Sequence, residues 1–278
     1  MKIAISAETT IDMPKELLDK FNIKTVPFTI ILGNEEKLDG EIDNNTIFEF
    51  VKNNNILPKT SAVNKFQYKK HFSSLLQDAD AIIHFSLSSE MSSAYSNAKD
   101  VASEMNNVFV IDSRSLSTGI ALLAIKASEL ASSGLALGDI LYVINNIISK
   151  VQASFILDKL DYLYKGGRCS SLAKFGANLL SLKPQIIVEN GKMRVGKKYV
   201  GKLDKVIAKY CSDTLSAYPH VDKSHAFVTY TTATPNMIET ATNALKNAGF
   251  INIHQTIAGG TITSHCGPLT MGILFISE

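Results

Sequence analysis

Short apolar runs alternate with helix-like segments along the first half of the chain, and this alternation constrains the fold more than any other feature. Ile3–Ser6, Ala81–Phe85 and Val108–Ile111 are apolar on both faces, as strands are when helices cover both sides of a sheet. Helix-like stretches lie between and after them, at Asn45–Asn53, Asn64–Leu76, Ser92–Met105 and Thr118–Ala131. The pattern predicts a three-layer α/β/α domain with a mostly parallel sheet.

Two local expectations concern the first fifty residues. Asp12 is a residue type that caps helices, and Pro14 suits the first turn of the helix that would follow. Thr25–Leu32 is rich in β-branched and aromatic residues, which predicts one strand that ends at Gly33-Asn34.

A different arrangement begins after about Ser154. Asn190-Gly191 is a strong two-residue turn signal between Ile186–Val188 and Met193–Val195, and it predicts a β-hairpin. Helices and strands then alternate, at Leu203–Leu215, Ala226–Tyr230, Pro235–Asn247, Ile251–Thr256 and Met271–Ile276. We therefore expect an α/β protein of two domains, residues 1–157 and residues 158–278, the second with a mixed sheet.

The charge balance and the motifs exclude several common functional classes. With 28 basic and 26 acidic residues the formal net charge is +2, so neither nucleic acid nor an anionic membrane is an expected partner. No apolar run is long enough to insert into a membrane, no signal-peptide pattern is present, and three widely spaced cysteines fit a cytoplasmic protein. P-loop, dinucleotide, zinc and serine-hydrolase motifs are absent, so we expect neither a cofactor nor a metal.

Hydroxyl side chains gather where predicted strands end. Thr60 and Ser61 form one such group, residues 86–93 a second and Asp112–Ser115 a third. Ligands of open parallel sheets bind beyond the carboxyl ends of the strands, and a helix that begins near Ser92 directs backbone N–H groups there. A single serine at such a place is more often a loop or capping residue. Several such loops together predict a site where neutral donors bind a carboxylate.

Two more segments carry residues suited to an anion site. Gly166-Gly167 permits a positive-φ turn and a close backbone approach, and Arg168 would clamp an anion or pair with an acid across the domains. A plain loop with a surface ion pair is an equally good interpretation. His265, in a predicted loop beside a Gly-Pro turn, can donate to a carboxylate or act as an acid or base. A structural role is the commoner one for a lone histidine, and we assign it to His71, His84, His220, His225 and His254.

These segments, in this order, resemble the DegV family of bacterial fatty-acid-binding proteins. The matching stretches span almost the whole chain: Thr60-Ser61-Ala62, Leu87–Ala98, Val110–Ser113, Leu160–Ser170, Ser181–Lys192 and Ser264–Pro268. The resemblance implies that a long-chain fatty acid lies between the two domains, with its tail in an apolar tunnel. The residues that it implies for the carboxylate are Thr60 or Ser61, Ser92, the Ser93 amide and His265, with Arg168 near the domain interface.

In characterised members of this family the protein is the carrier subunit of a fatty acid kinase. It presents the carboxylate to a separate ATP-dependent subunit that makes acyl phosphate, so the resemblance implies a binding protein and not an enzyme in its own right. The sequence departs from the family pattern at Glu8-Thr9 (for Asp-Ser), Ser92-Ser93-Ala94 (for Ser-Gly-Thr) and Lys198-Tyr199-Val200 (for Lys-x-Arg). The missing arginine bears on the kinase partnership more than on lipid binding.

Two other functions remain open at this stage. Ser92 and His265 would be the nucleophile and base of a hydrolase if an acid such as Asp112 oriented the histidine. The same loops would also suit another small anion, such as a phosphorylated metabolite. An apolar tunnel longer than about 12 Å distinguishes a fatty-acid site from a metabolite site.

Overall fold

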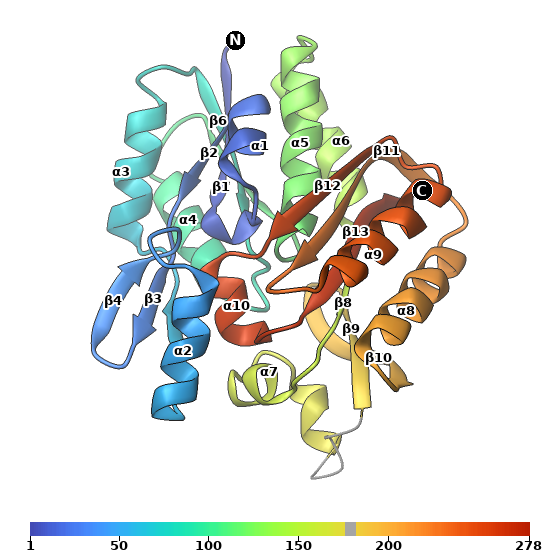
Figure 1. Cartoon of the computed structure of the whole chain (residues 1–278). Coiled ribbons are helices and arrows are strands. Elements are labelled where there is room, and N and C mark those ends of the chain that lie inside the picture. The colour runs from blue at the N-terminus through green and yellow to red at the C-terminus, as the bar shows by residue number, and fades with distance from the viewer. Residues whose placement is uncertain (176–181) are drawn as a thin grey trace.

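The computed structural model describes residues 1–175 and 182–278, with the side chains of residues 173–175 excepted. Ser181, the first residue of one of the matching stretches, lies outside the described residues. The described strands form three sheets: a parallel sheet, a larger mixed sheet and a small antiparallel one (Figure 1). None of the helices within the described residues combines the length and apolarity needed to cross a membrane.

The parallel sheet confirms the α/β prediction for the first half of the chain. Its order is β2-β1-β6-β7, formed by Ile23–Val26, Ile3–Glu8, Ala81–Ser86 and Val108–Asp112. α3 (Lys65–Leu75) and α4 (Ala94–Ala102) lie on one face of this sheet, and α5 (Thr118–Ser132) lies on the other. Because helices cover both faces, every residue of β6 is buried.

The mixed sheet has the order β10-β9-β8-β13-β11-β12, in which only the β11–β12 pair is parallel. Its strands are Lys192–Val200, Leu182–Glu189, Val151–Ile156, Met271–Ser277, Val221–Tyr230 and Asn252–Ile257. α8 (Leu203–Ala217) and α9 (Pro235–Asn247) pack on one face. The predicted domain boundary at 157/158 falls after β8, which by its pairing belongs to this second sheet; the division into domains remains a prediction.

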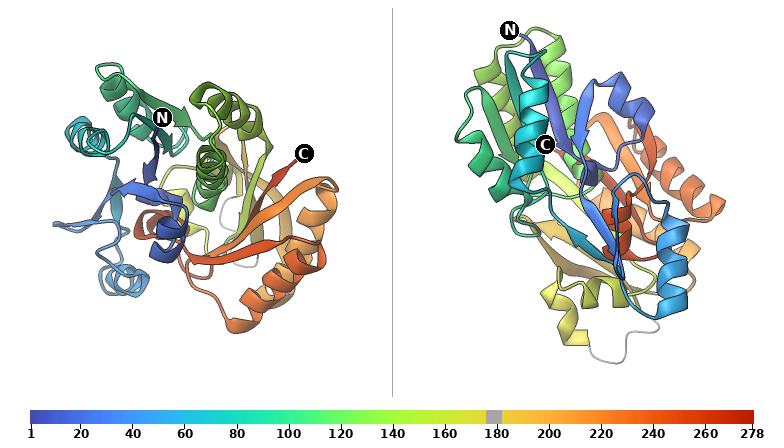
Figure 2. Two further views of the ribbon diagram at one scale, coloured as in Figure 1. Left: turned by 90° about the horizontal axis from the view of Figure 1, so that it is seen from above. Right: turned by 90° about the vertical axis from the view of Figure 1, so that its left-hand side faces the viewer.

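α5 lies between the two large sheets (Figures 1 and 2). It contacts β1, β2 and β6 of the parallel sheet and β8, β11 and β13 of the mixed sheet. Residues Thr118 to Ile125 are all buried, and α6 (Leu137–Ile147) covers a further side. The apolar residues of one helix therefore contribute to the packing of both sheets.

The third sheet, β4-β3-β5, was not expected from the sequence. It comprises Glu35–Leu38, Thr29–Leu32 and Lys59–Ser61, and α2 (Asn44–Asn54) connects its strands. The prediction of one strand over Thr25–Leu32 was wrong, because the chain leaves β2 at Val26 and enters β3 at Thr29. Pro27 lies in the break, where its ring removes the N–H that a continuous strand would donate.

Two local predictions near the candidate site also need correction. Asp12 does not cap α1 (Lys15–Lys20); it ends the 3₁₀ turn η1 (Thr9–Ile11) in a left-handed conformation, and Pro14 precedes α1. His265 does not lie in a loop but in a short helix, α10 (Gly260–Cys266). α10 has few apolar residues and starts with glycine, so neither periodicity nor a capping residue indicated a helix.

Candidate functional site

All six predicted site residues line a single cavity of about 310 Å³, named here the inner cavity. Thr60 and Ser61 come from β5, Ser92 and Ser93 from the turn before α4, Arg168 from the loop after α7 (Asp161–Lys165), and His265 from α10. These elements belong to segments far apart in the sequence. Their convergence is what the sequence pattern predicted; the binding role of each side chain remains a proposal.

Hydrogen-bonding groups gather in one part of the inner cavity. The side chains of Thr60 and His265 are hydrogen-bonded, with 2.8 Å between Oγ1 and Nε2. Ser92 Oγ accepts a hydrogen bond from the Ala94 amide at 3.2 Å, which leaves its own proton available to a ligand. Ser93 is the N-cap residue of α4, and the first amides of a helix lack intrahelical acceptors. The arrangement offers several donors to one acidic group.

His265 is neutral at pH 7 in the ligand-free protein. Burial, together with the nearby positive charge of Arg168, lowers its pKa from 6.5 to about 4. A neutral imidazole has one donor and one acceptor nitrogen, so it can exchange its bond with Thr60 for one to a ligand. A carboxylate beside His265 would raise this pKa again, which links ligand binding to proton uptake.

Apart from Thr261, the other described residues that line the inner cavity are apolar. Its walls are formed by Phe28, Ala62, Leu87, Met91, Leu116, Leu163, Met193, Ile262 and Cys266. They come from both halves of the chain, and most of them belong to the main hydrophobic core. A ligand that fits would have one polar end and an apolar body.

Both expected uses of the Gly-Gly pair are confirmed. Gly167 has a positive φ of 71°. A Cβ on Gly166 would lie 2.8 Å from Nδ1 of His265, so only glycine allows this loop to pack on the imidazole ring. Arg168 Nη1 donates to the Gly166 carbonyl at 2.7 Å, and among the described residues Arg168 forms no ion pair with an acid. The predicted pairing with an acid across the domains is therefore not seen.

A buried carboxylate holds the start of the serine-rich loop. Glu8, at the end of β1, accepts hydrogen bonds from Tyr68 Oη (2.6 Å), His84 Nε2 (3.1 Å) and the Leu87 amide (2.9 Å). Burial alone would raise the pKa of Glu8, but the bonds to His84 and Tyr68 and the charge of His84 lower it below its usual value. Glu8 is therefore ionised, and it fixes Leu87 at the wall of the inner cavity.

His84 continues this network away from the cavity. Its Nδ1 lies 2.9 Å from Ser6 Oγ, which in turn lies 2.7 Å from Nε2 of His71. Burial lowers the pKa of His71 to about 3, so this imidazole is neutral. The structural roles assigned to His71 and His84 fit this network.

Two further acidic side chains hold α10 from its N-terminal end. Asp12 accepts hydrogen bonds from the Gly259 amide at 2.8 Å and from the Ser117 hydroxyl. Asp39 accepts from the amides of Gly260 and Thr261, at 2.8 and 3.2 Å. These bonds satisfy amides that the first turn of a helix leaves unpaired. They fix the position of the helix that carries His265, and no sequence pattern beyond the residue types indicates them.

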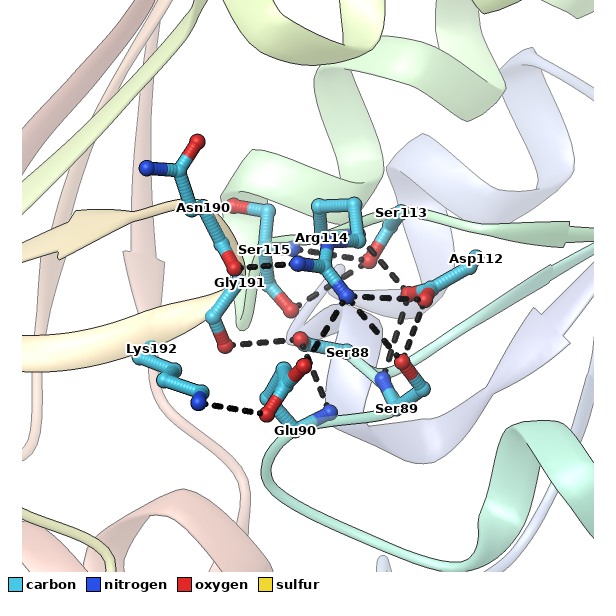
Figure 3. Close-up of polar contacts among 10 residues, drawn as sticks. All are labelled: Ser88, Ser89, Glu90, Asp112, Ser113, Arg114, Ser115, Asn190, Gly191 and Lys192. Carbon is cyan, nitrogen blue, oxygen red and sulfur yellow. Dashed lines mark hydrogen bonds and ion pairs between the residues drawn. The ribbon is translucent and has the colours of Figure 1, made fainter.

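The other two hydroxyl-rich segments form a clamp between the two sheets (Figure 3). Arg114 donates to the carbonyl of Asn190 in the β9–β10 turn and lies within ion-pair distance of Asp112 (3.6 Å) and Glu90 (3.4 Å). Ser88 Oγ donates to the Gly191 carbonyl at 2.7 Å. The predicted Asn-Gly turn is thus docked against the loop that leads into Ser92 and Ser93.

The geometry does not assemble the hydrolase relay considered above. Asp112 accepts hydrogen bonds from Ser89 and from the Arg114 amide, and it does not contact His265. The imidazole is bonded to Thr60, and Ser92 accepts a bond from the backbone. Within the described residues no cluster of three or more His, Cys, Asp or Glu side chains is able to bind a metal ion.

Comparison with known proteins places these features in a family. A family model described as "Uncharacterised protein, DegV family" matches residues 2–278. A DegV domain-containing protein of Caldanaerobacter subterraneus subsp. tengcongensis is 28% identical, over 99% of this chain and 98% of that protein. A protein of Thermotoga maritima named "Fatty acid-binding protein" is 26% identical, over 98% and 96% of the two chains.

Solved structures agree with the fold. The crystal structure of DegV from Bacillus subtilis, described as a fatty acid binding protein, has a TM-score of 0.87 at 25% identity and covers all of both chains. A DegV lipid binding protein of Thermotoga maritima has a TM-score of 0.88 at 25% identity, with 100% and 99% coverage. The family's combination of a parallel and a mixed sheet is therefore the fold of this chain.

Proposed function

Because this chain belongs to the DegV family, we propose that it binds a long-chain fatty acid in the inner cavity and serves as a carrier without turnover of its own. One observation carries the proposal: Thr60, Ser92 and His265, from three distant segments, meet around a cavity whose other lining residues are mostly apolar. This matches the chemistry of a fatty acid, which has a single acidic group on an apolar chain. The names of relatives as fatty acid binding proteins support the same ligand class.

The carboxylate would lie between Thr60, Ser92 and His265, where hydroxyl, amide and imidazole donors replace its hydration. Hydrogen bonds to a charged acceptor are about twice as strong as neutral ones, which offsets the cost of removing the carboxylate from water. Arg168 lines the same cavity and supplies a positive charge without an acidic partner among the described residues. The acyl chain would extend along the apolar walls towards Leu116, Leu163 and Met193.

The finer proposal is that the carrier presents the carboxylate to an ATP-dependent kinase subunit that forms acyl phosphate. Arg168 is exposed, so a carboxylate at the end of the cavity nearest Arg168 would lie close to the protein surface. The position where the family carries a docking arginine is Val200, whose side chain is 73% exposed. Acyl phosphate formed from loaded protein by a fatty acid kinase subunit and ATP, and not without this chain, is the expected result.

Mass spectrometry under native conditions tests lipid binding directly. Protein as purified is expected to carry a mass excess equal to one acyl chain of a common long-chain fatty acid, and to lose it on denaturation. Protein that is empty and takes up neither added palmitate nor oleate would contradict the proposal.

Substitutions test the assignment of the carboxylate. Ser92→Ala and His265→Ala are each expected to weaken fatty-acid binding by about 1.5–3 kcal/mol, the value of a hydrogen bond to a charged group. Ser103→Ala, at the other end of α4, and His220→Ala, on the surface, are matched controls that should bind as the wild type does. Unchanged affinity in both site variants would place the carboxylate elsewhere.

A further inference from the structure

A second, larger cavity opens next to the inner one. It measures about 860 Å³ and is named here the outer cavity. Residues of α2 and of the segment just after it line one part of it, and residues around α7 line another. Thr60, Arg168 and His265 line both cavities. The proposed position of the carboxylate is therefore the boundary between an apolar cavity and the outer one.

The outer cavity is strongly positive. Its described lining includes five cationic side chains and one acidic one, namely Lys52, Lys59, Lys159, Lys165 and Arg168 against Asp161. The formal net charge of the whole chain is +2, so the remainder of the chain carries a net negative charge. Positive charge is concentrated in one concave place on an otherwise slightly acidic protein.

None of these five cations forms an ion pair with an acid among the described residues. Some lysines elsewhere on the surface do, for example Lys15 with Asp19, Lys65 with Asp100 and Lys192 with Glu90. Lys52 and Lys165 occupy the last turns of α2 and α7, where the helix dipole favours a cation in any case. No such helix end accounts for Lys59, on β5, or for Lys159, before α7.

We infer that the outer cavity binds a phosphate group next to the bound carboxylate. The inference rests on the proposed function, because it takes the fatty acid to occupy the inner cavity. Phosphate carries more negative charge than a carboxylate and accepts several hydrogen bonds at once, so a concave ring of lysines and an arginine suits it. The phosphate belongs either to a nucleoside triphosphate that donates it or to the acyl phosphate that results.

The terminal phosphate of the nucleotide and the phosphate of the acyl phosphate would occupy the same position. A carboxylate oxygen of the fatty acid attacks the terminal phosphorus, an O–P bond forms, and the bond from phosphorus to the bridging oxygen breaks. The nucleoside diphosphate leaves with the electron pair, and nothing is oxidised or reduced. Throughout this step the transferred phosphoryl group lies beyond the carboxylate, on the side where Lys59, Lys159 and Lys165 line the outer cavity.

Calorimetric titration tests the donor source. Tripolyphosphate, added to palmitate-loaded protein at low salt, is expected to bind to the wild type. A variant with Lys59→Gln, Lys159→Gln and Lys165→Gln should bind it roughly tenfold more weakly or worse, as expected for the loss of three exposed charge pairs. A control variant with Lys205→Gln, Lys209→Gln and Lys223→Gln loses the same charge on exposed sites outside the cavity and should bind as the wild type does.

A second titration tests the product source. Hexadecyl phosphate and palmitate are compared on lipid-free protein, and the phosphate compound should gain affinity over palmitate in the wild type but not in the cavity variant. If only tripolyphosphate shows the expected result, the site binds the phosphate donor; if only hexadecyl phosphate does, the site binds the acyl phosphate product. Absence of binding in both, or equal weakening in the two triple variants, overturns the inference. Palmitate retained by all variants shows that the fatty-acid site itself is intact, so the two proposals fail separately.

Discussion

Glu8, at the end of β1, and Asp12, at the end of η1, are both buried, yet their pKa values shift in opposite directions. The pKa of Glu8 is lowered, whereas burial raises the pKa of Asp12 from 3.8 to about 8. Glu8 accepts three hydrogen bonds, and one donor is the imidazole of His84. Asp12 accepts two bonds from neutral donors and lies near a second carboxyl group, Asp39. Both side chains are buried, so their hydrogen-bonding and charged neighbours decide whether the pKa rises or falls.

The two carboxyl groups hold different parts of the lining of the inner cavity. Glu8 fixes Leu87 and the serine-rich loop, and Asp12, with Asp39, fixes the start of α10 and hence His265. One wall is therefore held by an ionised group and the other partly by a group that is mostly protonated at neutral pH. The neutral donors of the site therefore depend on ionisable groups that lie behind them.

Glu8→Gln should produce the largest effect. The side-chain NH₂ of the glutamine would face one of the three groups that now donate hydrogen bonds to Glu8. His84, which is fully buried, would lose its acidic partner. We expect the free energy of unfolding to fall by about 3 kcal/mol or more in urea denaturation. Fatty-acid affinity should fall too, because Leu87 is no longer held. Glu16→Gln, an exposed acid on α1, is the control, and an equal response of both variants would refute the distinction.

Asp39→Ala should have an intermediate effect. It leaves the amides of Gly260 and Thr261 without their acceptor at a buried helix end. The expected loss is about 2 kcal/mol of unfolding free energy, the upper range for removal of a helix cap. Asp43→Ala removes a cap from the exposed start of α2 and should cost less. A loss at Asp43 as large as that at Asp39 would show that burial of α10 is not what matters.

Asp12→Asn should have the smallest effect at pH 7, under about 1 kcal/mol, because the carboxyl group is already mostly protonated there. The sign of the pH dependence is specific. Between pH 3.8 and about 8 the folded protein binds more protons at Asp12 than the unfolded chain does, so stability falls as the pH rises.

Urea denaturation at pH 7 and pH 8 measures this slope. The wild type should lose up to about 1 kcal/mol per pH unit through Asp12, and the Asn variant should lose less. Asp78→Asn, an exposed aspartate, should keep the slope of the wild type. An unchanged slope in the Asp12 variant would mean that this carboxyl group is ionised at neutral pH, like Glu8.

Three strands of the parallel sheet, β1, β6 and β7, were predictable from the sequence because they are short apolar runs between periodic helices. The edge strand β2 was not, since Lys24 and Thr25 interrupt its apolar residues. The Asn190-Gly191 hairpin was predictable because the turn chemistry is local. The small β4-β3-β5 sheet was missed, since a proline divides one β-rich run and Glu35–Leu38 is fully exposed. α10 was missed as well, because its N-terminal amides are satisfied by Asp39 from a distant segment and not by a local cap.

The rule about carboxyl ends of parallel strands accounts for Ser92 and Ser93, which follow β6. It does not account for Thr60 and Ser61, which lie within β5 of the small antiparallel sheet, or for His265 on α10. That rule does not identify the acidic side chains that hold these donors in position. Glu8 stands at such a strand end and could have been assigned a role by the same rule. Asp12 and Asp39 could not, since their partners in α10 are more than two hundred residues away.

The place of α5 has a consequence for how the molecule opens. Without α5, each of the two large sheets would expose part of its apolar face. Neither half of the chain is therefore expected to fold stably by itself. Amide hydrogen exchange should find α5, β1 and β13 protected to a similar degree and released together in one global event. Entry of the proposed fatty acid would then rely on small, local displacements of surface loops such as the clamp at Ser88 and Arg114, while the shared interior stays closed.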